Sequence, residues 1–225
     1  MYDFVTGPLL WISFAIFFVG CIARIIWYIK GLNWQMDRVA YTHHTSYGIK
    51  GALRSLFSWL FPFVARSWRT HPVMTLMAFT FHIGVVVTPI FLLAHNMILK
   101  ERWGFSLWTL SETVADGLTI AVMVSAVFLV LRRIALPEVR ILTTAYDYLL
   151  IAITVAPFAT GFVASHHTGH YEFWLILHIL CGELVLIAIP FTKLCHLVLF
   201  FCSRIQLGMD YGIKRGGMKG KGLAW

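Results

Sequence analysis

Residues 174–201 read WLILHILCGELVLIAIPFTKLCHLVLFF, an almost wholly apolar run that is long enough to cross a membrane as a helix. Two histidines in it, His178 and His196, stand 18 residues apart. On one straight helix this spacing is five full turns, or about 27 Å. Because imidazoles are costly in hydrocarbon, two on one face indicate ligands for two stacked metal centres. The spacing therefore predicts a two-haem path for electrons.

Four further apolar runs precede this one, at residues 8–29, 72–99, 114–131 and 146–165. The chain is 59% hydrophobic and 12% charged, with a mean hydropathy of +0.78. This composition excludes a soluble domain, and the alternating pattern of membrane barrel strands is absent. We therefore expect an all-α integral membrane protein, with residues 1–207 forming one bundle of five transmembrane helices.

The basic residues predict the orientation of the bundle. Sixteen of the eighteen Lys and Arg residues fall on one side of the five-span plan, and only Lys100 and Arg102 fall on the other. The positive-inside rule then places the N-terminus outside and the C-terminus in the cytoplasm of a bacterial inner membrane. Since this asymmetry explains the net charge of +8, we expect no nucleic-acid partner.

Two segments outside the spans face the cytoplasm in this plan. Residues 47–68 interleave apolar and basic side chains, which is typical of a helix lying in the membrane surface or of a docking platform for a partner. Residues 208–225 are rich in glycine and lysine and lack apolar periodicity, so we expect a mobile basic tail.

Five histidines lie within or close to predicted spans. They are His71, His82, His95, His178 and His196. A b-type haem with two axial histidines takes one from each of two facing helices, so two haems need two pairs. Only the second and fifth spans can supply both pairs.

The motifs around these histidines resemble those of the membrane cytochrome b family typified by the gamma subunit of respiratory nitrate reductase. The fifth span carries His178, Gly182, a Pro190-Phe191 pair and His196 in the order of that family. The second span carries Phe81-His82-Ile83-Gly84, which is similar to its first ligand motif. An inner turn also resembles the family, with Arg132-Arg133, Pro137, Val139-Arg140, Thr143-Thr144 and Asp147.

The resemblance implies two haem b groups, with His82 paired to His196 on the inner side and His95 to His178 on the outer side. One departure concerns the second span, because His82 and His95 are thirteen residues apart where the family has ten. A straight helix would turn the second side chain about 220° from the first, so a kink is required, and Pro89 can provide it. By periodicity alone His71, eleven residues before His82, is an alternative ligand. However, it directly precedes Pro72 at the predicted start of a helix, where a residue commonly has a capping or surface role.

Within the family, the chain is most similar to the cytochrome b subunits of transmembrane redox complexes in sulfate reducers. This resemblance implies a periplasmic multihaem cytochrome c, a cytoplasmic iron–sulfur partner related to heterodisulfide reductase, and menaquinone as the quinone. The expected function is an electron-transfer subunit of an oxidoreductase complex. The chain has no cluster-binding cysteine runs and no nucleotide loop, so its redox partners must be other subunits.

Several charged residues are candidates for quinone binding or proton transfer beside the outer haem. Lys100, Glu112 and Asp116 are quinone candidates, each with the ordinary alternative of a solvated loop charge or helix-start acid. Glu183, inside the fifth span, is a candidate proton relay because an intramembrane carboxylate is costly. Two other functions stay open: a haem-free membrane anchor for other subunits, and a cation or proton transporter, although no internal repeat supports the latter.

Overall fold

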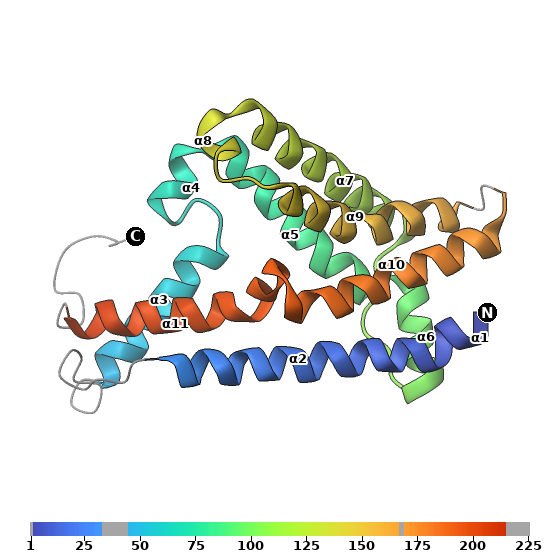
Figure 1. Cartoon of the computed structure of the whole chain (residues 1–225), viewed down its shortest axis with the longest axis horizontal. Helices are drawn as coiled ribbons and strands as arrows, with labels where there is room; N and C mark the ends of the chain where they lie inside the picture. The colour runs from blue at the N-terminus through green and yellow to red at the C-terminus, as the bar shows by residue number, and fades with distance from the viewer. Residues whose placement is uncertain (1, 33–44, 167–168, 215–225) are drawn as a thin grey trace. The chain divides into compact units, whose positions relative to one another are not determined.

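The computed structural model describes residues 2–32, 45–166 and 169–214, and within them every regular element is a helix. Five helices are long and apolar enough to cross a membrane (Figure 1). The first is a continuous run of α1 (Tyr2–Phe4), the π-helical η1 (Val5–Leu9) and α2 (Leu10–Gly31). The others are α5 (Pro72–Phe91), α7 (Glu112–Ala135), α9 (Ala145–Ser165) and α10 (Tyr171–Phe191). The expected number of helices that could cross a membrane is confirmed for the described residues.

The remaining elements connect these helices or follow them. They are α3 (Thr45–Leu60), α4 (Arg66–Thr70), α6 (Leu93–Trp103), α8 (Pro137–Arg140), the 3₁₀ turn η2 (Lys193–Cys195) and α11 (His196–Lys214). The chain forms two compact units. The first consists of Met1–Leu10 and Leu76–Val185, and the second of Trp11–Thr75 and Leu186–Trp225.

In the first unit, small residues let the helices approach closely. A methyl group at Gly84 of α5 would lie 2.3 Å from Cγ2 of Val122 on α7, so only glycine fits there. Helices α7 and α9 run side by side (Figure 1). The turn before α9 is closed by a capping box, in which the backbone N–H of Thr144 donates to Asp147 Oδ2 at 2.8 Å.

In the second unit, α3 crosses α11 with backbone against backbone (Figure 1). Gly208 and Gly212 form a small-residue pair one turn apart on α11, facing Gly51 on α3. A Cβ atom at Gly51 would stand 2.1 Å from the carbonyl oxygen of Gly208, and one at Gly212 would stand 2.4 Å from the carbonyl oxygen of Tyr47. This glycine crossing is the close packing that small-xxx-small sequences permit in membrane helices.

Helix α2 also packs on the C-terminal part of the second unit. The Tyr28 hydroxyl donates a hydrogen bond to Gln206 Oε1 on α11. Gly20 faces Pro190, whose Cβ would lie 2.6 Å from a methyl group at this glycine. Helix α2 therefore contacts both the end of α10 and α11.

Three expectations about continuity are wrong. The second span does not run unbroken from 72 to 99, because Leu92 is extended (φ −65°, ψ 135°) and separates α5 from α6. The fifth does not run from 174 to 201, because α10 ends at Phe191 and Thr192 is extended before η2. The five-turn register between His178 and His196 assumed one helix and does not apply. Finally, α11 continues to Lys214, so 208 is not a tail boundary, and residues 215–225 lie outside the described part.

Candidate functional site

The first unit places His95 of α6 beside His178 of α10. The centroids of the two imidazole rings are 6.0 Å apart, and the ring planes are 20° from parallel. These residues are far apart in the sequence, and the folding of the first unit brings their helices together. Two nitrogen heterocycles are thus gathered at one point between membrane-spanning segments.

Each of the two rings is oriented by a backbone carbonyl. His95 Nδ1 lies 2.7 Å from the carbonyl oxygen of Pro89, and His178 Nδ1 lies 2.8 Å from that of Pro157. A carbonyl oxygen only accepts hydrogen bonds, so both Nδ1 atoms carry the proton. The lone pair of each neutral ring is therefore on Nε2. In histidines that bind a metal through one ring nitrogen, a hydrogen bond from the other ring nitrogen fixes the tautomer and the orientation of the ring.

The helix break at Leu92 positions His95, and polar groups stabilise the break. The carbonyl of Pro89 accepts from the His95 ring, while Asn96 Nδ2 donates to the carbonyls of Ile90 and Leu92 at 2.8 and 3.0 Å. The backbone N–H of Leu107 donates to Asn96 Oδ1 at 2.8 Å. Asn96 is only 1% exposed. The break is thus an ordered feature in which carbonyls released from the helix find new donors.

Helix α9 positions His178 through a proline and a glycine. Pro157 supplies the carbonyl acceptor for the ring. Gly161, one turn later, leaves the room that the ring occupies, because a methyl group there would stand 2.8 Å from His178 Cε1 and Nδ1. Helix α9 therefore both accepts a hydrogen bond from the imidazole and packs closely against it.

The separation of the two rings is compatible with both histidines binding one metal. Two imidazoles on opposite faces of a metal have centroids about 6 Å apart, since each metal–nitrogen bond is about 2 Å long and each ring centre lies about 1 Å behind its nitrogen. The observed 6.0 Å agrees with this separation. Over residues 2–32, 45–166 and 169–214, no three His, Cys, Asp or Glu side chains gather to hold a bare metal ion. A metal held by these two residues would need its other ligands from a cofactor.

The other predicted ligands lie elsewhere. His82, in the first unit, has Nδ1 2.7 Å from the carbonyl of Ala78, and His196, in the second, has Nδ1 2.9 Å from that of Lys193. Each ring thus has the same kind of Nδ1 contact as the pair above. His71 follows α4, and its carbonyl accepts from the backbone N–H of Thr75 at 2.9 Å, so its backbone caps α5.

Glu183 is buried in α10 within the first unit. It is 3% exposed, and neither carboxylate oxygen has a hydrogen-bond partner in the described part of the chain. Burying a carboxyl group without a partner is costly, so such a residue marks a place of functional interest in a membrane helix. Its position five residues after His178 puts it close along the helix to the histidine pair, although on a different face.

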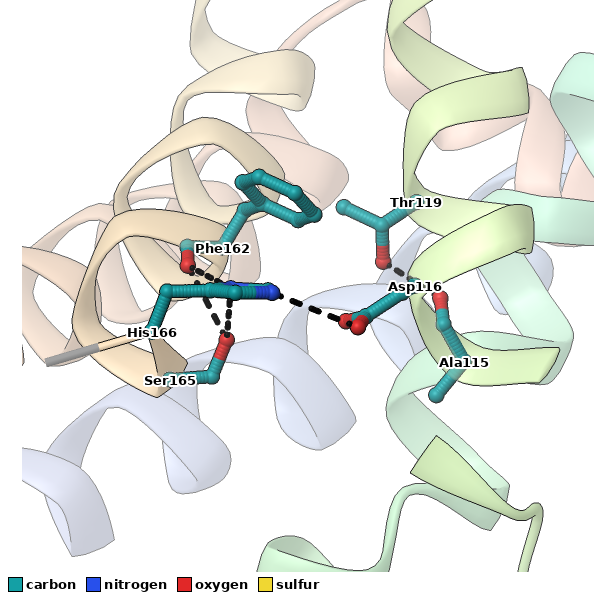
Figure 2. A network of polar contacts seen from close by, with 6 residues as sticks. All are labelled: Ala115, Asp116, Thr119, Phe162, Ser165 and His166. Atoms are coloured by element: carbon teal, nitrogen blue, oxygen red, sulfur yellow. Dashed lines mark hydrogen bonds and ion pairs between the residues drawn. The ribbon is translucent and has the colours of Figure 1, made fainter. Parts of the chain in front are cut away.

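The three quinone candidates differ in their surroundings. Lys100 in the last turn of α6 and Glu112 in the first turn of α7 are exposed, as the helix-dipole interpretation expects. Asp116 has a partner, because His166 Nε2 lies 3.4 Å from its Oδ2 (Figure 2). His166 Nδ1 also lies 2.8 Å from the carbonyl of Phe162 and 3.1 Å from Ser165 Oγ. This carboxylate–imidazole pair joins the start of α7 to the end of α9.

His166 was not singled out from the sequence as a partner of Asp116. Asp116 and His166 are fifty residues apart in the sequence. No spacing rule connects residues in different helices, and the contact depends on α7 and α9 running antiparallel with a short connection. The only available signal was that both lie at the same predicted end of adjacent spans.

Comparison with known proteins gives one full-length relative. A protein of Nitratidesulfovibrio vulgaris, named only "Protein", is 56% identical over 226 residues, which cover 100% of each chain. No model of a protein family matches the chain, and no solved structure matches it.

Proposed function

The chain belongs to the family of that Nitratidesulfovibrio vulgaris protein, and we propose, from its own residues, that it is a membrane subunit that binds haem b and transfers electrons. The name of the relative states no activity. The observation that carries this proposal is the histidine pair of the first unit, with centroids 6.0 Å apart and both Nδ1 atoms hydrogen-bonded to carbonyls. When bound, haem b supplies a one-electron redox centre whose potential depends on its axial ligands.

In this proposal His95 and His178 hold one haem iron through their Nε2 atoms. The carbonyls of Pro89 and Pro157 hold a proton on each Nδ1 atom and orient both rings, which leaves Nε2 to bind the metal. The second haem is proposed from the family resemblance, with His82 and His196 as ligands and His71 as the alternative. Two haems at different depths would let electrons cross the bilayer.

The proposed setting is a respiratory complex in the inner membrane of a bacterium, with the N-terminus outside. The resemblance supports a periplasmic multihaem cytochrome c, a cytoplasmic iron–sulfur subunit and menaquinone as partners. Five helices that are long and apolar enough to cross a membrane would contact lipid, as a multi-pass subunit must. These partners supply and remove the electrons, since the chain has no other redox motif.

Proton transfer would accompany quinol oxidation on the outer side. A quinol that gives up two electrons releases two protons, and nearby bases must accept them. The pair of Asp116 and His166 is half-exposed, with side chains 39% and 43% exposed, so it can exchange protons with water. Lys100 and Glu112 remain candidates for binding the quinone, and Glu183 for relaying a proton within the span.

The test is a pyridine haemochrome assay on the purified subunit, together with dithionite-reduced minus oxidised spectra. We expect two b haems per chain in the wild type. His95→Ala and His178→Ala should each lose the same haem, and the double variant should lose no more than either single one, because both residues hold one iron. His166→Ala is the matched control, since it removes an imidazole from the first unit without touching the pair.

The second haem is tested in the same assay with His82→Ala, His196→Ala and His71→Ala. Loss of one haem in the first two variants, with two retained in the third, supports the proposed pairing. Loss of one haem in His71→Ala, with both haems retained in His82→Ala, would make His71 the ligand in place of His82. A folded wild-type subunit without haem would sink the electron-transfer proposal and leave the haem-free anchor and the transporter, which ion-flux measurements in proteoliposomes then separate.

A further inference from the structure

A groove follows one face of α2 in the second unit. One part, of about 320 Å³, is lined by Arg24, Trp27, Tyr28, Gly31, Leu32 and Leu199. An adjoining part, of about 260 Å³, is lined by Gly20, Ala23, Arg24, Trp27, Pro190 and Phe191. The α2 residues recur at spacings of three and four, so they form one stripe on the helix. Because both parts share Arg24 and Trp27, we treat them as one feature, the Arg24 groove.

Arg24 brings a permanent charge into this largely apolar groove. Its guanidinium carbon lies 5.4 Å from the centre of the Trp27 ring. Its Nε is buried without a hydrogen-bond partner, and no carboxylate of the described residues forms an ion pair with it. A guanidinium stays protonated in proteins and presents a planar set of donors that suits carboxylate or phosphate. Among the described residues, the Nε donor of this cation therefore has no hydrogen-bond acceptor.

The position of Arg24 in the span indicates where its anion comes from. Seven residues separate it from Gly31 at the end of the helix, which corresponds to about 10 Å along the axis. Trp27 and Phe191 are 67% and 70% exposed, and side chains so exposed on a membrane-spanning helix face lipid. A basic residue at this depth is close to the level of lipid headgroups, and basic pockets between membrane helices bind acidic headgroups.

We infer that the Arg24 groove binds an anionic phospholipid. The phosphate lies on the Arg24 guanidinium, and one acyl chain follows the apolar part of the groove past Ala23 and Phe191 toward the middle of the bilayer. A neutral ligand such as a quinone would satisfy the shape of the groove and leave the charge of Arg24 unpaired. This inference does not depend on haem, because every residue that carries it lies in the groove.

The experiment is native mass spectrometry of the delipidated full-length protein, titrated separately with dioleoyl phosphatidylglycerol and dioleoyl phosphatidylcholine. We expect tighter binding of phosphatidylglycerol to the wild type. Arg24→Gln should weaken that binding about tenfold and weaken phosphatidylcholine binding much less, because the choline cation of phosphatidylcholine already balances its phosphate. Arg24→Lys should retain part of the preference. Lys30→Gln is the matched control, because it removes an exposed charge from the same helix without lining the groove.

A second variant tests the groove without changing its charge. Ala23→Leu fills the apolar part and should weaken binding of both lipids. Thermal unfolding of each variant, followed by circular dichroism, separates loss of the site from loss of the fold. Equal binding of the two lipids by the wild type, or unchanged phosphatidylglycerol binding in a folded Arg24→Gln protein, would overturn the inference. So would displacement of bound phosphatidylglycerol by stoichiometric menaquinone, which would assign the groove to quinone.

Discussion

Gly161 of α9 lies directly against the imidazole of His178, so that a methyl group at this glycine would stand 2.8 Å from Cε1 and Nδ1 of the ring. Gly161→Ala must therefore move the ring or the helix and break the contact between His178 and the Pro157 carbonyl. We expect loss of the haem proposed for this pair and a destabilisation of about 1–3 kcal/mol.

Gly117→Ala is the control for that substitution. It lies on α7 of the same unit, and a methyl group there would have no neighbour within 4 Å. It should keep the full haem content. The two variants are compared by haemochrome assay and thermal unfolding, and an unaltered reduced spectrum in Gly161→Ala would contradict a ligand role for His178.

Asn96 should contribute strongly to stability because it closes the break before α6. Asn96→Ala leaves the carbonyl of Ile90 and the N–H of Leu107 without their side-chain partner in a buried place. We expect a loss of about 2–3 kcal/mol in the free energy of unfolding and a weaker hold on His95. The measurement is urea unfolding in detergent, with Met97→Ala, 53% exposed, as the neighbour expected to change little. Equal effects of the two variants would show that the break is not stabilised by this side chain.

The glycine crossing of α3 and α11 should tolerate no side chain. Gly208→Ala would put a Cβ atom 2.5 Å from the carbonyl oxygen of Gly51, which forces the backbones apart. We expect about 1–3 kcal/mol of destabilisation and faster proteolysis of α3. Gly117→Ala, in α7 with nothing within 4 Å, should instead be neutral or stabilise by up to about 1 kcal/mol, because alanine favours helix. Similar melting temperatures for the two variants would disprove the packing argument.

The pair of Asp116 and His166 should matter for proton transfer and little for stability. Both side chains are half-exposed, so Asp116→Asn or His166→Gln should change the free energy of unfolding by less than about 1 kcal/mol. Haem content should stay constant. If the pair accepts protons from quinol, haem reduction by a menaquinol analogue should slow about tenfold or more, as measured by stopped-flow absorbance. Glu172→Gln, an exposed acid in the first turn of α10, is the control, and equal rates in all variants would remove the pair from the proposal.

Hydrophobic length alone was enough to predict five membrane-spanning helices. The predicted C-terminal boundaries of two of them were wrong, because hydropathy carries no information about breaks in the helical backbone. Pro89 is compatible with α5 and the break comes three residues later, at Leu92. Likewise Pro190 lies inside α10, and the break at Thr192 is stabilised by its own hydroxyl, which accepts from the N–H of Leu194 at 3.1 Å. Both breaks are stabilised by hydrogen bonds with a nearby polar side chain, Asn96 in one case and Thr192 in the other, and not by a loss of hydrophobicity in the sequence.

The histidines themselves could be singled out from the sequence, but their surroundings could not. Resemblance suggested that His95 and His178 act together, and the structure places their rings near each other. The orienting carbonyls belong to Pro89 and Pro157, which lie inside α5 and α9, and no residue pattern encodes their proximity to the two imidazoles. The ligand roles of all four proposed residues remain predictions for the haem assay.

The glycine crossing also has a consequence for biosynthesis. Helix α3 leaves the ribosome long before α11, because more than a hundred residues separate them in the chain. Until α11 emerges, the backbone of α3 around Gly51 lacks the partner that covers it in the finished protein. The first unit can assemble as its helices enter the membrane in order, whereas the second closes only when nearly the whole chain has been made. A ribosome that stalls before α11 would therefore release a chain with an open second unit, which quality-control proteases can recognise.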